Sequence, residues 1–138
     1  MVVVIIDGQG GGIGGAVIKA IRQNFGNDLE IWGLGTNALA AAQMIKAGAN
    51  RCASGENAIL QSVKEAQVIL GTISVVLANS MMGEMTPAAA EAVNSSPAWK
   101  ILLPLSREKV QVVGVLEEPL PHLIEIMMGR LREVMSHV

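Results

Sequence analysis

Tyrosine is absent from this chain, and its 138 residues include only one phenylalanine and two tryptophans. Because 51% of the residues are nevertheless hydrophobic, the core has to be built from aliphatic side chains and methionine. A chain of this length suffices for one ordinary domain and leaves no room for two. We therefore expect residues 1–138 to form a single domain, and the aliphatic composition favours a sheet that helices bury on both faces.

Other scarce features each exclude a class of protein. The single cysteine, Cys52, excludes an internal disulfide and metal sites that need two cysteines, and no other spacing of metal ligands is present. No apolar run reaches the about 20 residues that a membrane-spanning helix needs. A net charge of −2 with scattered basic residues leaves no footprint for nucleic acid. No basic leader precedes the apolar residues 2–6, so we expect a cytoplasmic protein.

Aliphatic runs alternate with segments of helical periodicity along the chain. We predict strands over residues 2–6, 29–34, 50–53, 67–71, 99–103 and 110–115, and helices over residues 13–25, 38–47, 56–65, 87 onward and 121–135. This alternation is typical of βαβ units. The expected fold class is α/β: a Rossmann-like, doubly wound, mostly parallel sheet of five to six strands with helices on both faces, in three layers, with strand order 3-2-1-4-5-6.

A glycine-rich turn between the first strand and the first helix is the most informative segment. It comprises Asp7, Gly8, Gln9, Gly10, Gly11, Gly12, Ile13 and Gly14, followed by Gly15. Ordering so many glycines costs entropy, and a turn that brings backbone N–H groups up to a phosphate at a helix start supplies a reason. A tight turn that binds nothing is the alternative. Two frames fit, one running from Gly10 to Gly15 and one from Gly8 to Gly14, whereas a P-loop would need a following Gly-Lys-Ser/Thr.

The residues near the turn bear on which ligand it would hold. Asp7 would repel a phosphate unless its carboxylate binds N–H groups of the turn, a ribose hydroxyl or a Mg²⁺ ion. The acid that usually holds the adenine ribose, about 20 residues after the glycines, is missing. Thr36 and Asn37 stand there instead, and they either bind a ribose or 2′-phosphate or cap the next helix. We therefore expect NADP, another adenine nucleotide or coenzyme A rather than NAD.

Polar residues gather after the predicted strands, at the edge of the sheet where such folds bind ligands, yet they define no reaction. The absence of tyrosine excludes the Tyr–Lys pair of short-chain dehydrogenases. His122 follows two glutamates and forms either an acid–base couple or a surface contact, and Cys52 is expected to be buried. Residues 79–87 contain three methionines and Gly83, and they form either a lid over a nucleotide or an ordinary packed connection.

Six segments together resemble a family of short bacterial proteins catalogued as a domain of unknown function. They are residues 7–14, 34–40, 55–58, 78–87, 95–98 and 114–124. The resemblance implies a Rossmann-like fold and a stand-alone protein of this length. It favours the glycine frame from Gly8 to Gly14, because the family often has another residue at the position of Gly15. No activity is established for the family, so the resemblance implies no catalytic residue.

Three hypotheses of function follow. The first is a nucleotide- or dinucleotide-binding protein, and the second is a small NADP-linked or group-transfer enzyme that uses Asp7, Glu56, Glu84 or His122. The third is an interaction module without a ligand. We also expect a homodimer or larger assembly through the closing helix. Its apolar stripe packs on the sheet and leaves Ile126 and Met128 outside; the stripe comprises Leu120, Leu123, Ile124, Met127, Leu131, Val134 and Met135.

Overall fold

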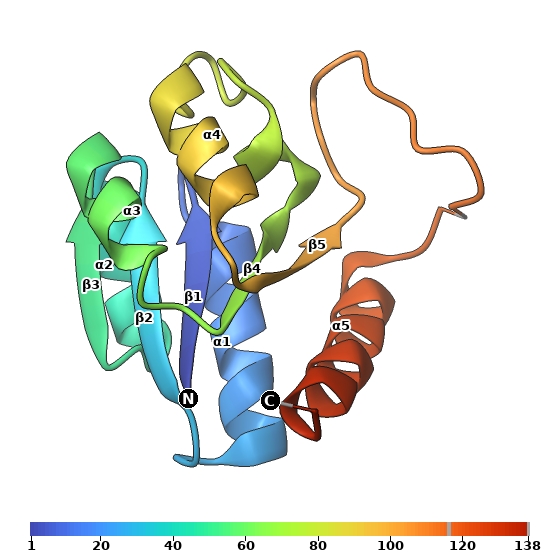
Figure 1. Cartoon of the computed structure of the whole chain (residues 1–138). Helices are drawn as coiled ribbons and strands as arrows, with labels where there is room; N and C mark the ends of the chain where they lie inside the picture. Colours follow the sequence, from blue (N-terminus) through green and yellow to red (C-terminus); the bar gives the residue numbers. More distant parts are fainter. Residues whose placement is uncertain (116, 138) are drawn as a thin grey trace.

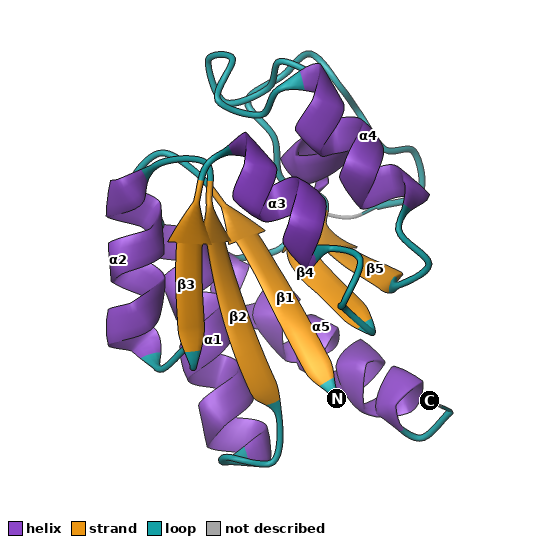
Figure 2. Ribbon diagram, turned by 60° about the vertical axis from the view of Figure 1, so that its left-hand side comes forward, coloured by secondary structure: helices purple, strands orange, loops and turns teal. Residues whose placement is uncertain are grey.

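The computed structural model describes residues 1–115 and 117–137, and it places a parallel sheet between two layers of helices (Figures 1 and 2). The strands are β1 (Val2–Asp7), β2 (Glu30–Gly35), β3 (Arg51–Ser54), β4 (Val68–Thr72) and β5 (Trp99–Leu103), in the order β3-β2-β1-β4-β5. The helices are α1 (Gly12–Phe25), α2 (Ala38–Ala47), α3 (Glu56–Ser62), α4 (Pro87–Ser95) and α5 (Leu120–Met135). The predicted Rossmann-like, three-layer α/β fold is confirmed.

Strand β1 lies at the centre of the sheet, and its side chains divide the core in two. Val3 and Ile5 pack toward α1, α2 and α5, whereas Val4 and Ile6 pack toward α3 and α4. All four side chains are at most 1% exposed. A parallel strand that helices cover on both faces reads as a continuous aliphatic run, which is why the alternation of a half-buried strand is absent from this segment.

The chain runs from β1 outward through β2 to β3, then crosses to β4 on the other side of β1. The sheet therefore has a topological switch point between β1 and β4. The two strands are in register from Val3 opposite Val68 to Ile5 opposite Leu70, so their carboxyl ends finish side by side. Any group that follows either strand consequently lies at one common edge of the sheet.

The prediction of a sixth strand over residues 110–115 is wrong. The segment belongs to a long connection between β5 and α5 that extends away from the sheet (Figure 1). Within the described part of the chain, the only backbone hydrogen bond that this segment makes joins Val110 N–H to Glu108 C=O, at 2.8 Å. Valine favours a strand only when a neighbouring strand and a packed face are supplied. The connection supplies neither, so the β-branched pattern alone misled the prediction.

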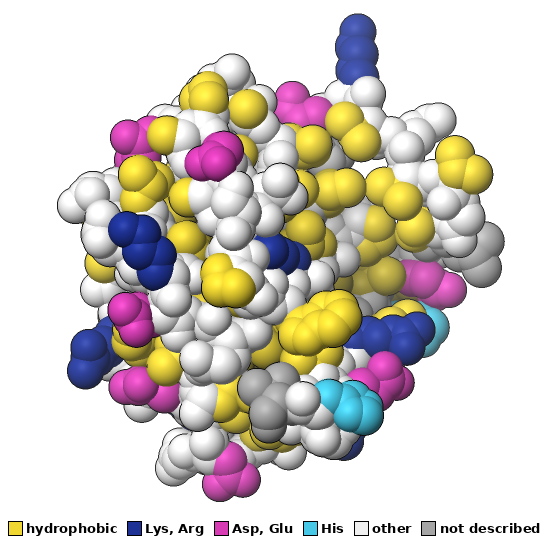
Figure 3. All heavy atoms as spheres, in the orientation of Figure 1, with side chains coloured by type: hydrophobic (Ala, Val, Ile, Leu, Met, Phe, Trp, Pro, Cys, Tyr) yellow, Lys and Arg dark blue, Asp and Glu magenta, His cyan; other side chains and the backbone are white. Residues whose placement is uncertain are grey.

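The same connection carries much of the exposed apolar surface. Val113 is 98% exposed, and Val110, Val112 and Val115 are each 43% or 44% exposed. Apolar side chains gather on the matching protrusion at the upper right of Figure 3. Helix α5 instead buries its stripe in the core, and Met128, expected to lie outside the stripe, is only 3% exposed. Ile126 remains 45% exposed.

If this protein self-associates, we expect residues 110–115 to contribute more to the contact than α5. Val113→Asp places a charge on the most exposed of the four valines, and it should shift the sedimentation equilibrium toward the 14.5 kDa monomer without changing the melting temperature. Ile126→Asp is the matched control on α5. Dissociation by Ile126→Asp alone would assign the contact to the helix, and a wild-type monomer at tens of micromolar would exclude both surfaces.

Candidate functional site

The glycine turn joins the end of β1 to the start of α1 in a tightly folded path. Gly11 N–H donates to Gly8 C=O at 3.0 Å, and Gly11 takes a left-handed φ of 73°. A Cβ on Gly11 would lie 2.8 Å from Cα of Ala40 in α2, closer than real contacts allow. Gly11 is therefore required both by its backbone conformation and by the close approach of α2.

Asp7 closes this turn with its carboxylate. Oδ1 accepts a hydrogen bond from Gly8 N–H at 2.8 Å, and Oδ2 accepts one from Gly14 N–H at 2.6 Å. Of the arrangements that the sequence allowed for Asp7, the structure has the one in which the carboxylate binds N–H groups of the turn. Burial raises the pKa of Asp7, and the negative charge of Glu84 adds to that increase, while the two backbone N–H groups oppose it.

Three N–H groups of the turn remain available. Those of Gly10, Gly12 and Ile13 donate no hydrogen bond to any residue that the structure describes. Gly10 and Gly12 are exposed, and a Cβ on either would meet no atom within 4 Å. Because Gly12 and Ile13 begin α1, their N–H groups also carry the positive end of the helix dipole.

A cavity of about 280 Å³ opens beside the turn, at the carboxyl ends of β1 and β4. Its walls include Asp7, Gly8, Gln9 and Ile13 on one side and residues 105–108 on another. The cavity therefore lies at the switch point, where ligands bind in open α/β sheets.

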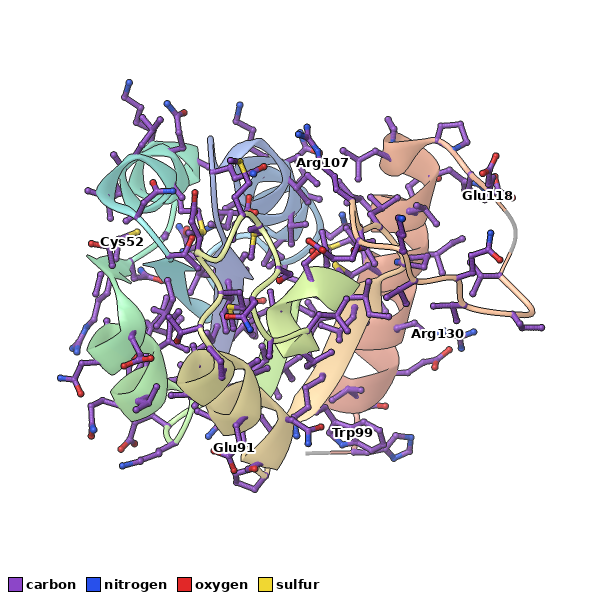
Figure 4. All side chains as sticks on the ribbon, turned by 90° about the horizontal axis from the view of Figure 1, so that it is seen from above. Cys52, Glu91, Trp99, Arg107, Glu118 and Arg130 are labelled. Atoms are coloured by element: carbon purple, nitrogen blue, oxygen red, sulfur yellow. The ribbon has the colours of Figure 1, made fainter. Side chains whose placement is uncertain are left out.

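Arg107 is the one arginine among the residues that line this cavity. Its side chain is exposed, and it makes no ion pair within the part of the chain described here. Seen from above in Figure 4, Arg107 lies beside α1, whereas Cys52 and Glu118 lie toward opposite sides of the molecule. A guanidinium without a carboxylate partner remains available to a phosphate.

Glu84, in the connection between β4 and α4, lies against the glycine turn. Its Oε1 accepts hydrogen bonds from Gln9 N–H at 2.9 Å, from Thr36 Oγ1 at 2.6 Å and from Asn37 Nδ2 at 2.9 Å. The Thr36 hydroxyl contributes most to holding the pKa of Glu84 below its ordinary value, and the N–H of Gln9 and the amide of Asn37 add to the effect. The ionised carboxylate of Glu84 thus lies at the carboxyl end of β2, bonded to the two residues that follow that strand.

Thr36 and Asn37 are already engaged within the protein. Asn37 caps α2, because its Oδ1 accepts from Ala40 N–H at 2.8 Å, and its Nδ2 donates to Gln9 C=O at 2.9 Å as well as to Glu84. The capping interpretation of Asn37 is therefore confirmed. Sequence reasoning treated Glu84 only as one of four candidate catalytic groups. The missing acid near residues 35–37 was the signal that could have directed attention to it.

The segment that carries Glu84, residues 79–85, folds over the turn with an unusual backbone. Asn79, Met81 and Met82 all have positive φ values, between 56° and 66°. A Cβ on Gly8 would lie 2.7 Å from Sδ of Met81 and 3.0 Å from Oε1 of Glu84, so the segment packs directly on the turn. Met85 is fully buried in the core, whereas Met82 is 94% exposed. Packing thus accounts for Met85 and Met81 but not for Met82.

The remaining candidate catalytic groups lie apart from the cavity. His122 Nδ1 is 2.8 Å from Oε2 of Glu118 on the surface, and this hydrogen bond raises the pKa of His122. Glu56 accepts from Thr86 Oγ1 at 2.5 Å. Cys52 is half-buried, and burial raises the pKa of its thiol, which disfavours the nucleophilic thiolate. Asp7 and Glu84 are the only two of the four candidate catalytic groups that the structure brings to the glycine turn.

Within residues 1–115 and 117–137, no helix is both long and apolar enough to cross a membrane. No group of three or more histidine, cysteine, aspartate or glutamate side chains there is arranged to hold a metal ion.

The fold and the turn together define a Rossmann-like α/β protein with a glycine-rich turn between its first strand and its first helix. The chain belongs to the family described as "Domain of unknown function (DUF3842)", whose model matches residues 2–136. Comparisons with curated proteins and with solved structures gave no match.

The two carboxylates of the site should influence stability in opposite directions as pH changes. The folded pKa of Glu84 lies below its ordinary value of 4.5, so Glu84 stabilises the fold above that pH and loses this contribution as pH falls through the folded pKa. Asp7 has a raised pKa, so its ionisation costs stability as pH rises from 3.8 through its folded pKa.

We therefore expect Glu84→Gln to flatten the loss of stability in acid. Between neutral pH and about pH 3, wild type should lose more of its free energy of unfolding than the variant does. Urea unfolding at a series of pH values measures the difference. Glu65→Gln is the control, because Glu65 is exposed and its carboxylate accepts no hydrogen bond from the residues described here. Identical profiles for wild type and Glu84→Gln would contradict the assignment of three stabilising hydrogen bonds to this carboxylate.

Proposed function

We propose that this protein binds a nucleotide, with a phosphate held at the glycine turn and the adjoining part of the ligand in the cavity beside it. The observation that carries the proposal is a group of three N–H groups, that of Gly10 in the turn and those of Gly12 and Ile13 at the start of α1, which donate to no residue that the structure describes. They stand at the switch point of the sheet, next to a cavity that Arg107 lines. Backbone N–H groups, a helix dipole and a guanidinium are all suited to a phosphate.

The size of the cavity limits how much of the ligand lies inside it. Pockets for drug-sized ligands begin at roughly 300 Å³, and this one measures about 280 Å³. A phosphate with an adjoining sugar-sized group fits that space, and the remainder of a nucleotide would lie across the outer surface of the turn. The exposed positions of Gly10 and Gly12, with no atom near either Cα on the side where a side chain would stand, leave room for it.

The arrangement favours binding over catalysis by the chain alone. Both carboxylate oxygens of Asp7 accept hydrogen bonds from N–H groups at the two ends of the turn, and burial raises the pKa of Asp7. The surface pair formed by His122 and Glu118 is not among the residues that line the cavity. We therefore place nucleotide binding ahead of the small-enzyme hypothesis.

A ligand of this site should stabilise the fold measurably. At 100 times its dissociation constant it should add about 2.7 kcal/mol to the free energy of unfolding, or roughly 5–10 °C in melting temperature. NAD, NADP, ATP, ADP, AMP, FAD and coenzyme A form the panel for a thermal-shift screen. At least one should give such a shift, and a flat response to the whole panel would count against the proposal.

Gly12→Val should abolish that shift without unfolding the protein. A Cβ on Gly12 meets no atom within 4 Å, so the added side chain clashes with no part of the protein and would occupy the space proposed for the phosphate. Gly129→Val is the matched control, because Gly129 is also a helical glycine with open space around its Cβ but lies on α5. Arg107→Gln should weaken binding in a salt-dependent way. Unaltered binding by Gly12→Val would place the ligand elsewhere.

A further inference from the structure

The carboxylate of Glu84 is held by one oxygen only. All three of its hydrogen bonds, from Gln9, Thr36 and Asn37, reach Oε1. Oε2 accepts none from any residue in the described ranges. The three donors therefore fix the orientation of the carboxylate and leave one charged oxygen free to accept hydrogen bonds from another molecule.

This free oxygen is at the position where an acid holds the ribose in Rossmann folds. That acid normally follows the second strand, about 20 residues after the glycines. Here Thr36 and Asn37 follow β2, and they bind Glu84, which comes from the connection between β4 and α4. The tertiary structure thus brings a carboxylate, from more than 40 residues further along the chain, to the end of β2.

The carboxylate is also next to the proposed phosphate position. Gly8 lines the cavity, and Oε1 of Glu84 would lie 3.0 Å from a Cβ at Gly8. Gln9 N–H, which belongs to the same turn, donates directly to Glu84. Glu84 itself is not among the residues that line the cavity. The ribose that Glu84 would bind therefore lies outside the cavity, on the side of the turn where Gln9 and Glu84 meet.

We propose that Glu84 binds the 2′- and 3′-hydroxyls of the ligand's ribose and excludes ligands that carry a 2′-phosphate, an inference that rests on the nucleotide binding proposed above. Hydroxyl groups donate to the free Oε2, whereas a phosphate offers only acceptors and a like charge. The site therefore selects the unphosphorylated diol of NAD, AMP or ADP. This reverses the preference for NADP that the missing acid after β2 suggested.

No cationic side chain in the described part of the chain is paired with the carboxylate of Glu84. The groups bonded to Glu84 are a hydroxyl, an amide and a backbone N–H, and among the described residues no lysine, arginine or histidine forms an ion pair with it. The lowered pKa of Glu84 keeps it ionised at neutral pH. Asp7, on the other side of the turn, adds a second negative charge nearby. A 2′-phosphate at Glu84 would meet both charges, and no lysine, arginine or histidine among the described residues is bonded to Glu84 to offset them.

The test compares ligands that differ only at the ribose. Isothermal titration calorimetry of wild type with NAD and NADP, with AMP and adenosine 2′,5′-bisphosphate, and with ADP and 2′-deoxy-ADP isolates the contribution of that position. We expect each 2′-phosphorylated ligand to bind at least roughly tenfold more weakly than its partner. We expect 2′-deoxy-ADP to bind more weakly than ADP by several-fold, because one hydrogen bond to a charged acceptor is lost.

Glu84→Gln is the decisive variant. The amide oxygen of glutamine can accept the same three hydrogen bonds as Oε1, so the turn keeps its geometry. The amide nitrogen replaces the free charged oxygen with a donor, which should bring the NAD-to-NADP affinity ratio close to one. Glu91→Gln removes one negative charge from the exposed face of α4 and should leave the ratio unchanged.

Each result decides between outcomes. Equal binding of NAD and NADP by wild type, or an unchanged ratio in Glu84→Gln, overturns this inference, while the loss of binding in Gly12→Val would still support the phosphate site. Tighter binding of every ligand by Glu84→Ala would show that the Glu84 side chain obstructs the site and does not bind the ribose. That result also overturns the inference. Failure of the whole panel to bind wild type overturns the proposed function and this inference together.

Discussion

The structure at the end of β1 depends on a single half-buried carboxylate, that of Asp7. Asp7 Oδ2 binds Gly14 N–H in the first turn of α1, while Oδ1 binds Gly8 N–H at the start of the glycine turn. These two bonds fix the direction in which α1 leaves the sheet. They also give the Gly14 N–H, one of the groups at the helix start that lack an acceptor within the helix, a hydrogen-bond partner, while those of Gly12 and Ile13 have none among the described residues. A carboxylate in this place opposes an anionic ligand in principle, yet here it organises the donors that would bind one.

The second constraint is the topology of the sheet, which brings the carboxyl ends of β1, β2 and β4 to one edge. Because of it, the connection after β4 crosses the glycine turn and places Glu84 on Thr36 and Asn37. The two arms of the site differ in character as a result. In the proposed binding mode, the N–H groups of the turn and Arg107 would bind a phosphate, and Glu84 would accept hydrogen bonds from hydroxyl groups. A nucleotide is the class of ligand that presents an anion and a diol at neighbouring positions.

The elements whose formation depends on local pattern were predictable. The run of aliphatic residues in β1, the helical spacing in α1 and the Thr86-Pro87 start of α4 all lie within a few residues of their predicted bounds. Residues 110–115 failed the same reasoning, because a strand needs a partner and the pattern carries no information about whether one is present. Met128 was misplaced for a related reason: α5 buries a wider face than its regular stripe suggested.

The sequence by itself determined the α/β alternation, the glycine turn after β1 and the place of Asp7 at its start, because each is set by residues adjacent in the chain. It also offered the cap of α2 as one of two roles for Asn37, because a cap and its N–H donor are only three residues apart, and the structure shows that cap. Only the tertiary structure decided that Glu84 completes the end of β2, because Glu84 and Thr36 are 48 residues apart and meet through the crossover from β1 to β4. Such a contact leaves no periodicity or spacing in the sequence, since it is produced by the order of the strands.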